Sequence, residues 1–144
     1  MSRTVTRSVI LVASVALLGA ACSKGGGSST GGKGEGGQIK IGSDTANDHG
    51  TKSVVGKSDL EVEQDDFYFE PTIIEGKAGQ KVKLELKNEG KNLHNFSIDS
   101  LGIDQDVNTD QSATTTVTIP QSGTLEFYCK YHRTQGMVGE LKVA

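Results

Sequence analysis

From residue 58 onward, apolar and polar residues alternate in short segments that are separated by glycine or proline. The clearest alternation is at Val82, Leu84 and Leu86, which are interspersed with lysine and glutamate. Because a period of two places successive side chains on opposite faces of an extended chain, each such segment predicts a half-buried β-strand. We find no convincing helical period here. About seven to eight short strands are predicted, which is typical of an all-β, Greek-key β-sandwich.

The N-terminal part of the chain has the features of an export signal. Arg3 and Arg7 precede an apolar run at residues 9–18, and small residues then lead to Cys22. The apolar run is too short to span a bilayer, and its order of charge, apolar stretch and small residues is that of a secretory leader. We therefore predict a signal peptide at residues 1–21 with cleavage before Cys22.

The sequence Leu-Leu-Gly-Ala-Ala-Cys, which ends at Cys22, resembles a bacterial lipoprotein box. The resemblance implies that Cys22 is lipidated and anchors the mature protein to a membrane, on its extracytoplasmic or periplasmic side. Such boxes usually have leucine three residues before the cysteine, where this chain has Gly19. Cleavage without lipidation, giving a soluble secreted or periplasmic protein, is the alternative.

Residues 22–57 are predicted to form a flexible tether. Glycine and serine dominate residues 23–37, and such a composition cannot bury apolar surface. Residues 38–41 offer an added edge strand as an alternative for part of the tether. The stretch that follows is polar and turn-like, so His49 is predicted to be solvated. The folded domain is accordingly expected to span residues 58–144.

Charge and cysteine content narrow the function classes. The formal net charge is −3, and no basic cluster suited to nucleic-acid binding remains once the signal is removed. Two cysteines in an exported protein would ordinarily predict a disulfide, here between Cys22 and Cys129. If Cys22 is lipidated, Cys129 has no partner, and a bound metal would protect its thiol in an oxidising compartment.

Four side chains with metal-binding chemistry lie in two segments. Cys129, His132 and Met137 are close together near the C-terminus, and His94 begins an upstream strand-like segment. Soft sulfur ligands favour Cu(I), imidazole accepts both oxidation states, and a His₂Cys site with a weak axial methionine is the pattern of electron transfer. The Cys-x₂-His spacing alone also occurs in zinc sites, but a thioether is a poor fourth zinc ligand. The donor set therefore favours one copper ion.

The segment Glu-Phe-Tyr-Cys-Lys-Tyr-His-Arg-Thr-Gln-Gly-Met-Val-Gly-Glu-Leu-Lys-Val resembles the C-terminal ligand loop of the cupredoxins, in the plastocyanin-like branch with its Cys-x₂-His-x₄-Met spacing. The upstream Phe-Glu-Pro-Thr-Ile-Ile-Glu-Gly-Lys-Ala-Gly-Gln-Lys-Val and Asn-Leu-His-Asn-Phe resemble the second signature of that family. The resemblance implies that His94, Cys129 and His132 are strong equatorial ligands of a type 1 copper and that Met137 is its weak axial ligand. It also implies that Asn95 ties the two ligand segments together by hydrogen bonding.

These features predict an electron carrier that holds one type 1 copper and exchanges electrons with transient redox partner proteins, without a small-molecule substrate. The alternative is an extracytoplasmic copper chaperone or storage protein, although such proteins are typically rich in methionine and this chain has two. We do not expect an enzyme. The histidines His49, His94 and His132 are too few to build a further copper centre.

Overall fold

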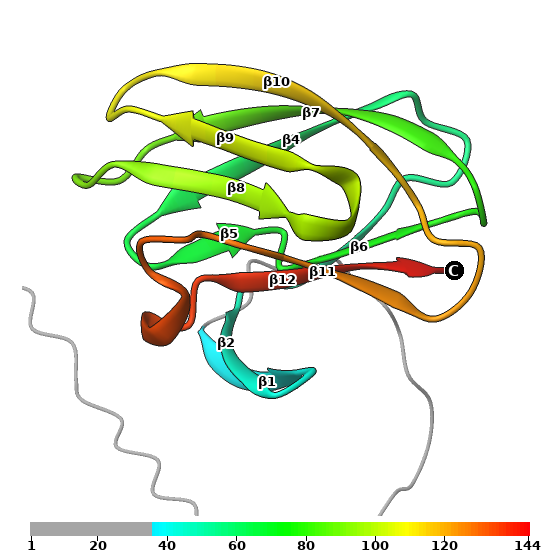
Figure 1. Cartoon of the computed structure of the whole chain (residues 1–144), viewed down its shortest axis with the longest axis horizontal. Helices are drawn as coiled ribbons and strands as arrows, with labels where there is room; N and C mark the ends of the chain where they lie inside the picture. The colour runs from blue at the N-terminus through cyan, green and yellow to red at the C-terminus, as the bar shows by residue number, and fades with distance from the viewer. Residues whose placement is uncertain (1–35) are drawn as a thin grey trace, which may run out of the picture. The chain divides into compact units, whose positions relative to one another are not determined.

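The computed structural model describes residues 36–144 (Figure 1). The predicted signal peptide at 1–21, the predicted lipidation site Cys22 and the first part of the predicted tether lie outside these residues. Within residues 36–144, no helix has the length and apolar character needed to cross a membrane.

Strands dominate the described part of the chain, which contains no α-helix. Three strands precede residue 58, namely β1 (Gly37–Ile41), β2 (Asp44–Asp48) and β3 (Thr51–Ser53). Those that follow are β4 (Asp59–Asp65), β5 (Tyr68–Glu70), β6 (Ile73–Gly76), β7 (Lys81–Asn88), β8 (His94–Ile98), β9 (Ile103–Val107), β10 (Ser112–Thr118), β11 (Thr124–Tyr128) and β12 (Val138–Val143). Two 3₁₀ turns, η1 (Asp99–Leu101) and η2 (Arg133–Gln135), interrupt the strands.

Two sheets form the sandwich (Figure 1). One has the strand order β10-β7-β4-β5 and the other β3-β6-β12-β11-β8-β9. The chain passes between the sheets several times, for example from β7 to β8, so strands that are adjacent in the sequence often lie in different layers. The predicted all-β sandwich is confirmed.

Aromatic rings join the two layers at the centre of the core. Phe69 of β5 meets Phe96 of β8 and Phe127 of β11 edge-on, with ring centroids 5.8 and 5.1 Å apart. All three rings are fully buried. Since large aromatic side chains bury the most apolar surface of any residues, this cluster fixes the spacing of the sheets beside the site described below. The alternation predicted for β7 is also observed, with Val82, Leu84 and Leu86 fully buried.

The structure corrects the predicted domain boundary. A tether was expected through residue 57, but residues 37–53 contain β1, β2 and β3. β3 pairs in parallel with β6 and extends the six-stranded sheet, while β1 and β2 form a separate two-stranded sheet. The edge strand considered at 38–41 is therefore present as β1, but its partner is β2 and not an edge of the sandwich.

Packing explains why a polar segment is ordered. Ile41 and Ala46 of the β1–β2 hairpin are buried against Val138 of β12, and Val54 belongs to the main core. The hairpin lies beside β12 in Figure 1. Its few buried apolar side chains are too sparse to give a clear sequence pattern, and hydrogen bonds from Asn47 to distant parts of the chain add to the packing.

Candidate metal centre

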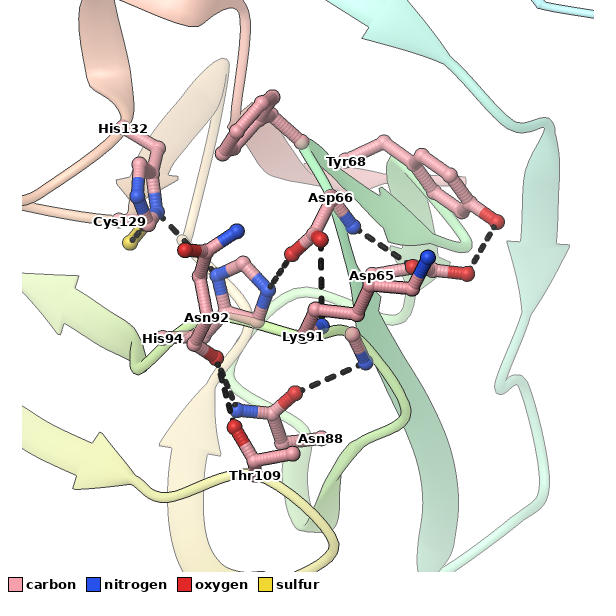
Figure 2. Close-up of polar contacts among 12 residues, drawn as sticks. Asp65, Asp66, Tyr68, Asn88, Lys91, Asn92, His94, Thr109, Cys129 and His132 are labelled. Atoms are coloured by element: carbon pink, nitrogen blue, oxygen red, sulfur yellow. Dashed lines mark hydrogen bonds and ion pairs between the residues drawn. The ribbon is translucent and has the colours of Figure 1, made fainter.

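Three of the predicted ligands meet at one end of the sandwich. His94 is the first residue of β8, Cys129 follows β11, and His132 precedes η2. Their ligand atoms all lie within 4.8 Å of one another. The Nδ1 atoms of the two histidines are 3.2 Å apart, and the Cys129 Sγ lies 3.5 Å from His132 Nδ1. Figure 2 shows the three side chains together. They form a candidate copper site.

Backbone hydrogen bonds close the loop that carries Cys129, His132 and Met137. The His132 N–H donates to the Cys129 carbonyl, and the Cys129 N–H donates to the Met137 carbonyl. The Met137 N–H in turn donates to the His132 carbonyl at 3.2 Å. Gly136 makes the tight return possible, since its φ of 93° lies in the left-handed region that favours glycine. The fourth predicted ligand, Met137, is thus tied to both loop ligands through its backbone, and its side chain is fully buried.

Burial sets the protonation preferences of the ligands. Burial raises the pKa of the Cys129 thiol, and the nearby backbone of Tyr131, Asn95 and His132 partly offsets that effect. Burial also lowers the pKa of His94 and of His132, and the proximity of His132 lowers that of His94 further. At neutral pH two uncharged imidazoles, one of them partly exposed, therefore lie beside a buried thiol.

This donor set suits a soft cation. Neutral imidazoles present lone pairs without having to lose protons, and a cation would favour the thiolate that burial alone disfavours. Two nitrogens and one sulfur are also the donors that copper prefers in electron-transfer sites. The residues that are present therefore fit one copper ion.

Asn95 lies between the two ligand segments. Its side-chain oxygen accepts a hydrogen bond from the Lys130 N–H at 3.4 Å and another from the Ser97 hydroxyl at 2.6 Å. Its side-chain nitrogen donates to the carboxylates of Asp104 and Asp106 on β9. A buried asparagine thus connects β8, β9 and the residue that follows Cys129.

Sequence reasoning missed two neighbours of the histidines. The Asp66 carboxylate lies 3.0 Å from His94 Nε2, and the Phe67 ring packs against His132 with centroids 4.6 Å apart. Burial by itself would raise the pKa of Asp66, but hydrogen bonds from Asn92, the Lys91 N–H and His94 outweigh it and hold that pKa below its usual range. No local motif links position 66 to position 94, so nothing in the sequence pointed to this contact.

The prediction for His49 is wrong. Its ring stacks on that of Tyr68, with centroids 3.4 Å apart and planes 6° from parallel, and only 19% of its side chain is exposed. The ring is therefore packed and not solvated, because the polar segment around it is part of the fold. His49 does not belong to the cluster of ligand atoms.

The β1–β2 hairpin contacts the ligand loop directly. The Asn47 side-chain amide donates to the Gln135 carbonyl at 2.9 Å and to the Phe67 carbonyl at 3.0 Å. The Asn47 N–H donates to the Gly136 carbonyl at 2.9 Å. One residue of the hairpin therefore holds both the turn that precedes Met137 and the segment that packs on His132.

A β-sandwich with one cysteine and two histidines converging at its end defines the cupredoxin class of proteins. The family model described as "Cupredoxin-like domain" matches residues 43–143, and the chain belongs to this family. The match begins within the hairpin segment, in agreement with the corrected boundary.

Individual relatives add detail. A segment of 39 residues is 54% identical to the copper-resistant cuproprotein CopI of Pseudomonas aeruginosa. That segment covers 27% of this chain and 22% of CopI, so most of the relative has no counterpart in the match. Reduced auracyanin from Roseiflexus castenholzii superposes with a TM-score of 0.51 at 20% identity, over 61% of this chain and 98% of that one. Auracyanin B gives a TM-score of 0.51 at 21% identity, over 60% of this chain and 88% of that one. These two likenesses support the fold.

Proposed function

We propose that this protein is an electron carrier that binds one type 1 copper ion through His94, Cys129, His132 and Met137. The observation that carries the proposal is the convergence of a thiol and two Nδ1 atoms within 4.8 Å at one end of a cupredoxin fold. His94 and Cys129 are fully buried, whereas His132 is partly exposed. The site is therefore shielded from water except along one ligand.

A bound copper ion would supply one-electron chemistry by cycling between Cu(II) and Cu(I). The protein itself would restrain the positions of the copper ligands. His94 and Cys129 come from the ends of different strands, and the loop of His132 and Met137 is closed by backbone hydrogen bonds. Ligands held in this way change position little when the charge of the site changes, which keeps the barrier to electron transfer low.

Electrons would pass to a redox partner protein through His132. It is the ligand whose ring approaches the surface, and the rings of Phe67 and Tyr131 flank it with centroids 4.6 and 6.3 Å from its own. A small, partly apolar surface of this kind suits the brief, weak encounters of redox proteins. The expected partners are therefore other redox proteins that dock over His132.

A second candidate function is copper handling. The partial identity with a copper-resistant cuproprotein favours it. Such a protein has to release its ion, however, and three of the four proposed ligands here are fully buried. Release would require the ligand loop to open, so the structure supports electron transfer better.

Visible absorption of the full mature protein tests the proposal. We expect Cu(II) to produce an intense blue colour from thiolate charge transfer, which ascorbate bleaches and air or ferricyanide restores. Cys129→Ser should abolish the colour, whereas His49→Ala, outside the ligand cluster, should retain it. A protein that remains pale, or that gives up its copper to a mild chelator, would instead be a copper-handling protein.

We further propose that the protein acts outside the cytoplasm and is anchored to a membrane through a lipid on Cys22. The support is the sequence of residues 1–22, with its arginines, apolar run and lipoprotein-like box. Cell fractionation tests this part separately. The wild-type protein should partition with membranes and incorporate labelled fatty acid, and Cys22→Ser should lose both properties.

A further inference from the structure

The Asp66 carboxylate is held in place by contacts at both of its oxygens. Its Oδ1 lies 3.0 Å from His94 Nε2, and its Oδ2 accepts a hydrogen bond from the Lys91 N–H at 3.1 Å. Figure 2 shows the carboxylate between the His94 ring and the Lys91 backbone. Asp66 follows β4 in one sheet and His94 begins β8 in the other, so this contact connects the two layers.

This contact decides which nitrogen of His94 carries the proton. A carboxylate can only accept hydrogen bonds, so Nε2 must be the N–H of a neutral His94 ring. Nδ1 is then left with its lone pair. It is Nδ1 that faces the candidate metal position, 3.2 Å from the Nδ1 of His132.

Gly90 leaves the space that the contact needs. A Cβ at this position would lie 2.5 Å from Asp66 Oδ1 and 2.6 Å from His94 Nε2, closer than side chains tolerate. The Gly90 N–H is fixed by the Asn88 side-chain oxygen at 2.9 Å. The segment before His94 therefore passes directly over the pair formed by the carboxylate and the imidazole.

From this geometry we infer that Asp66 is a positioning residue of the metal centre, which orients His94 and raises the electron density at its Nδ1. The inference rests on the proposed function and specifies how one ligand is adjusted. A carboxylate that accepts the second N–H of a ligand histidine fixes its tautomer and increases its basicity. A more basic nitrogen stabilises Cu(II) more than Cu(I), so Asp66 lowers the reduction potential of the centre.

The test compares Asp66→Asn with Glu61→Gln in the full mature protein. Asparagine keeps the size of the Asp66 side chain and removes its charge. Glu61 is an exposed carboxylate on β4, so Glu61→Gln changes the net charge by the same amount away from the site. We expect Asp66→Asn to weaken Cu(II) binding relative to Cu(I) by about 10-fold to 100-fold. Each tenfold change raises the reduction potential by about 59 mV for a one-electron couple. Glu61→Gln should leave the potential unchanged.

Two outcomes of this comparison would overturn the inference. One is an Asp66→Asn protein with altered stability and a wild-type potential, which would make the contact a link between sheets only. The other is an equal shift in Glu61→Gln, which would assign the effect to net charge. Gly90→Ala is a second route to the same result, since it pushes the carboxylate and the ring apart and should also raise the potential.

A measurement on the copper-free wild-type protein does not depend on the folding of any variant. Nitrogen chemical shifts of the imidazoles should show His94 with its proton on Nε2, and a proton on Nδ1 would contradict the inference. A wild-type protein that never turns blue would refute the proposed function, whereas a blue protein whose potential ignores Asp66 would refute this inference alone.

Discussion

Arg133, next to the candidate ligand His132, donates hydrogen bonds from both Nε and Nη2 to a single carboxylate oxygen of Asp44, at 3.0 and 2.8 Å. Arg133 also pairs with the carboxylate of Glu126 and lies over the Tyr128 ring. Asp44 begins β2 of the N-terminal hairpin, so the pair joins two segments that are far apart in the sequence. The hairpin is thus a support for the ligand loop.

Asn47→Ala should weaken this support. It removes the two hydrogen bonds to the carbonyls of Gln135 and Phe67 while leaving the backbone bond to Gly136. Each lost bond is worth about 0.5–1.5 kcal/mol, so urea denaturation should show a total loss of about 1–3 kcal/mol in the free energy of unfolding. Copper should also dissociate faster, as followed by loss of colour in a chelator.

Asp44→Asn is the matched comparison within the hairpin. Both partners of the Asp44–Arg133 pair are partly exposed, so removing its charge should lower the free energy of unfolding by about 1 kcal/mol or less. If Asn47→Ala proved as stable as wild type and retained copper equally well, the hairpin would have no supporting role.

Gly139→Ala should destabilise the core beside the site. A Cβ at Gly139 would run into the Phe127 ring and lie 2.5 Å from the Thr72 carbonyl oxygen, which is backbone and cannot move aside. Overpacking of this kind lowers the free energy of unfolding by about 1–3 kcal/mol. Gly37→Ala is the control, because a Cβ there has no neighbour within 4 Å and should change stability little. Equal stability of the two variants would contradict the packing described for Phe127.

The copper-free protein should lose stability as the pH falls below about 6.5, the ordinary pKa of histidine. Burial lowers the pKa of His94 and of His132 in the folded state. The unfolded chain then binds more protons than the folded one, so the free energy of unfolding decreases as the pH falls through these lowered pKa values. Above the unfolded pKa both states are neutral and the stability from this source is constant.

Denaturation curves of the copper-free protein between about pH 7.5 and 5.5 measure this effect around the ordinary histidine pKa. His94→Gln should show a shallower dependence than wild type, because one of the two groups no longer titrates. Glu63 and Glu126, whose pKa values burial raises, act in the opposite direction at lower pH and are common to both proteins. A wild-type protein that gained stability on acidification within this range would contradict the assignment.

Met137→Leu tests whether the Met137 thioether is a copper ligand, as proposed. Leucine fills a similar volume and keeps the backbone bonds to Cys129 and His132, so the fold should be retained. A weakly bound thioether would adjust the potential of a blue copper site without supplying its main bonds, so the blue colour should persist and the reduction potential should change. An unchanged potential would show that Met137 is a core residue and not a ligand.

Much of this protein follows from local patterns in the sequence. The alternation in β7 specifies a strand with one buried face, because the two-residue period of an extended chain does not depend on the rest of the fold. The spacing of Cys129, His132 and Met137 likewise places all three in one loop, whatever surrounds it. The residue types in that loop, together with His94, supply sulfur and imidazole donors, and this donor set indicates copper.

Tertiary structure alone decided the remaining features. It brought Asp66 to His94 and Asp44 to Arg133, and it packed the His49 ring, which follows the hairpin, on Tyr68. These contacts are hydrogen bonds and ring stacking between positions that are distant along the chain. Such contacts produce no periodic pattern in the sequence. A polar residue has the same identity whether its side chain is solvated or bonded to a distant part of the chain, so only the folded structure distinguishes the two cases.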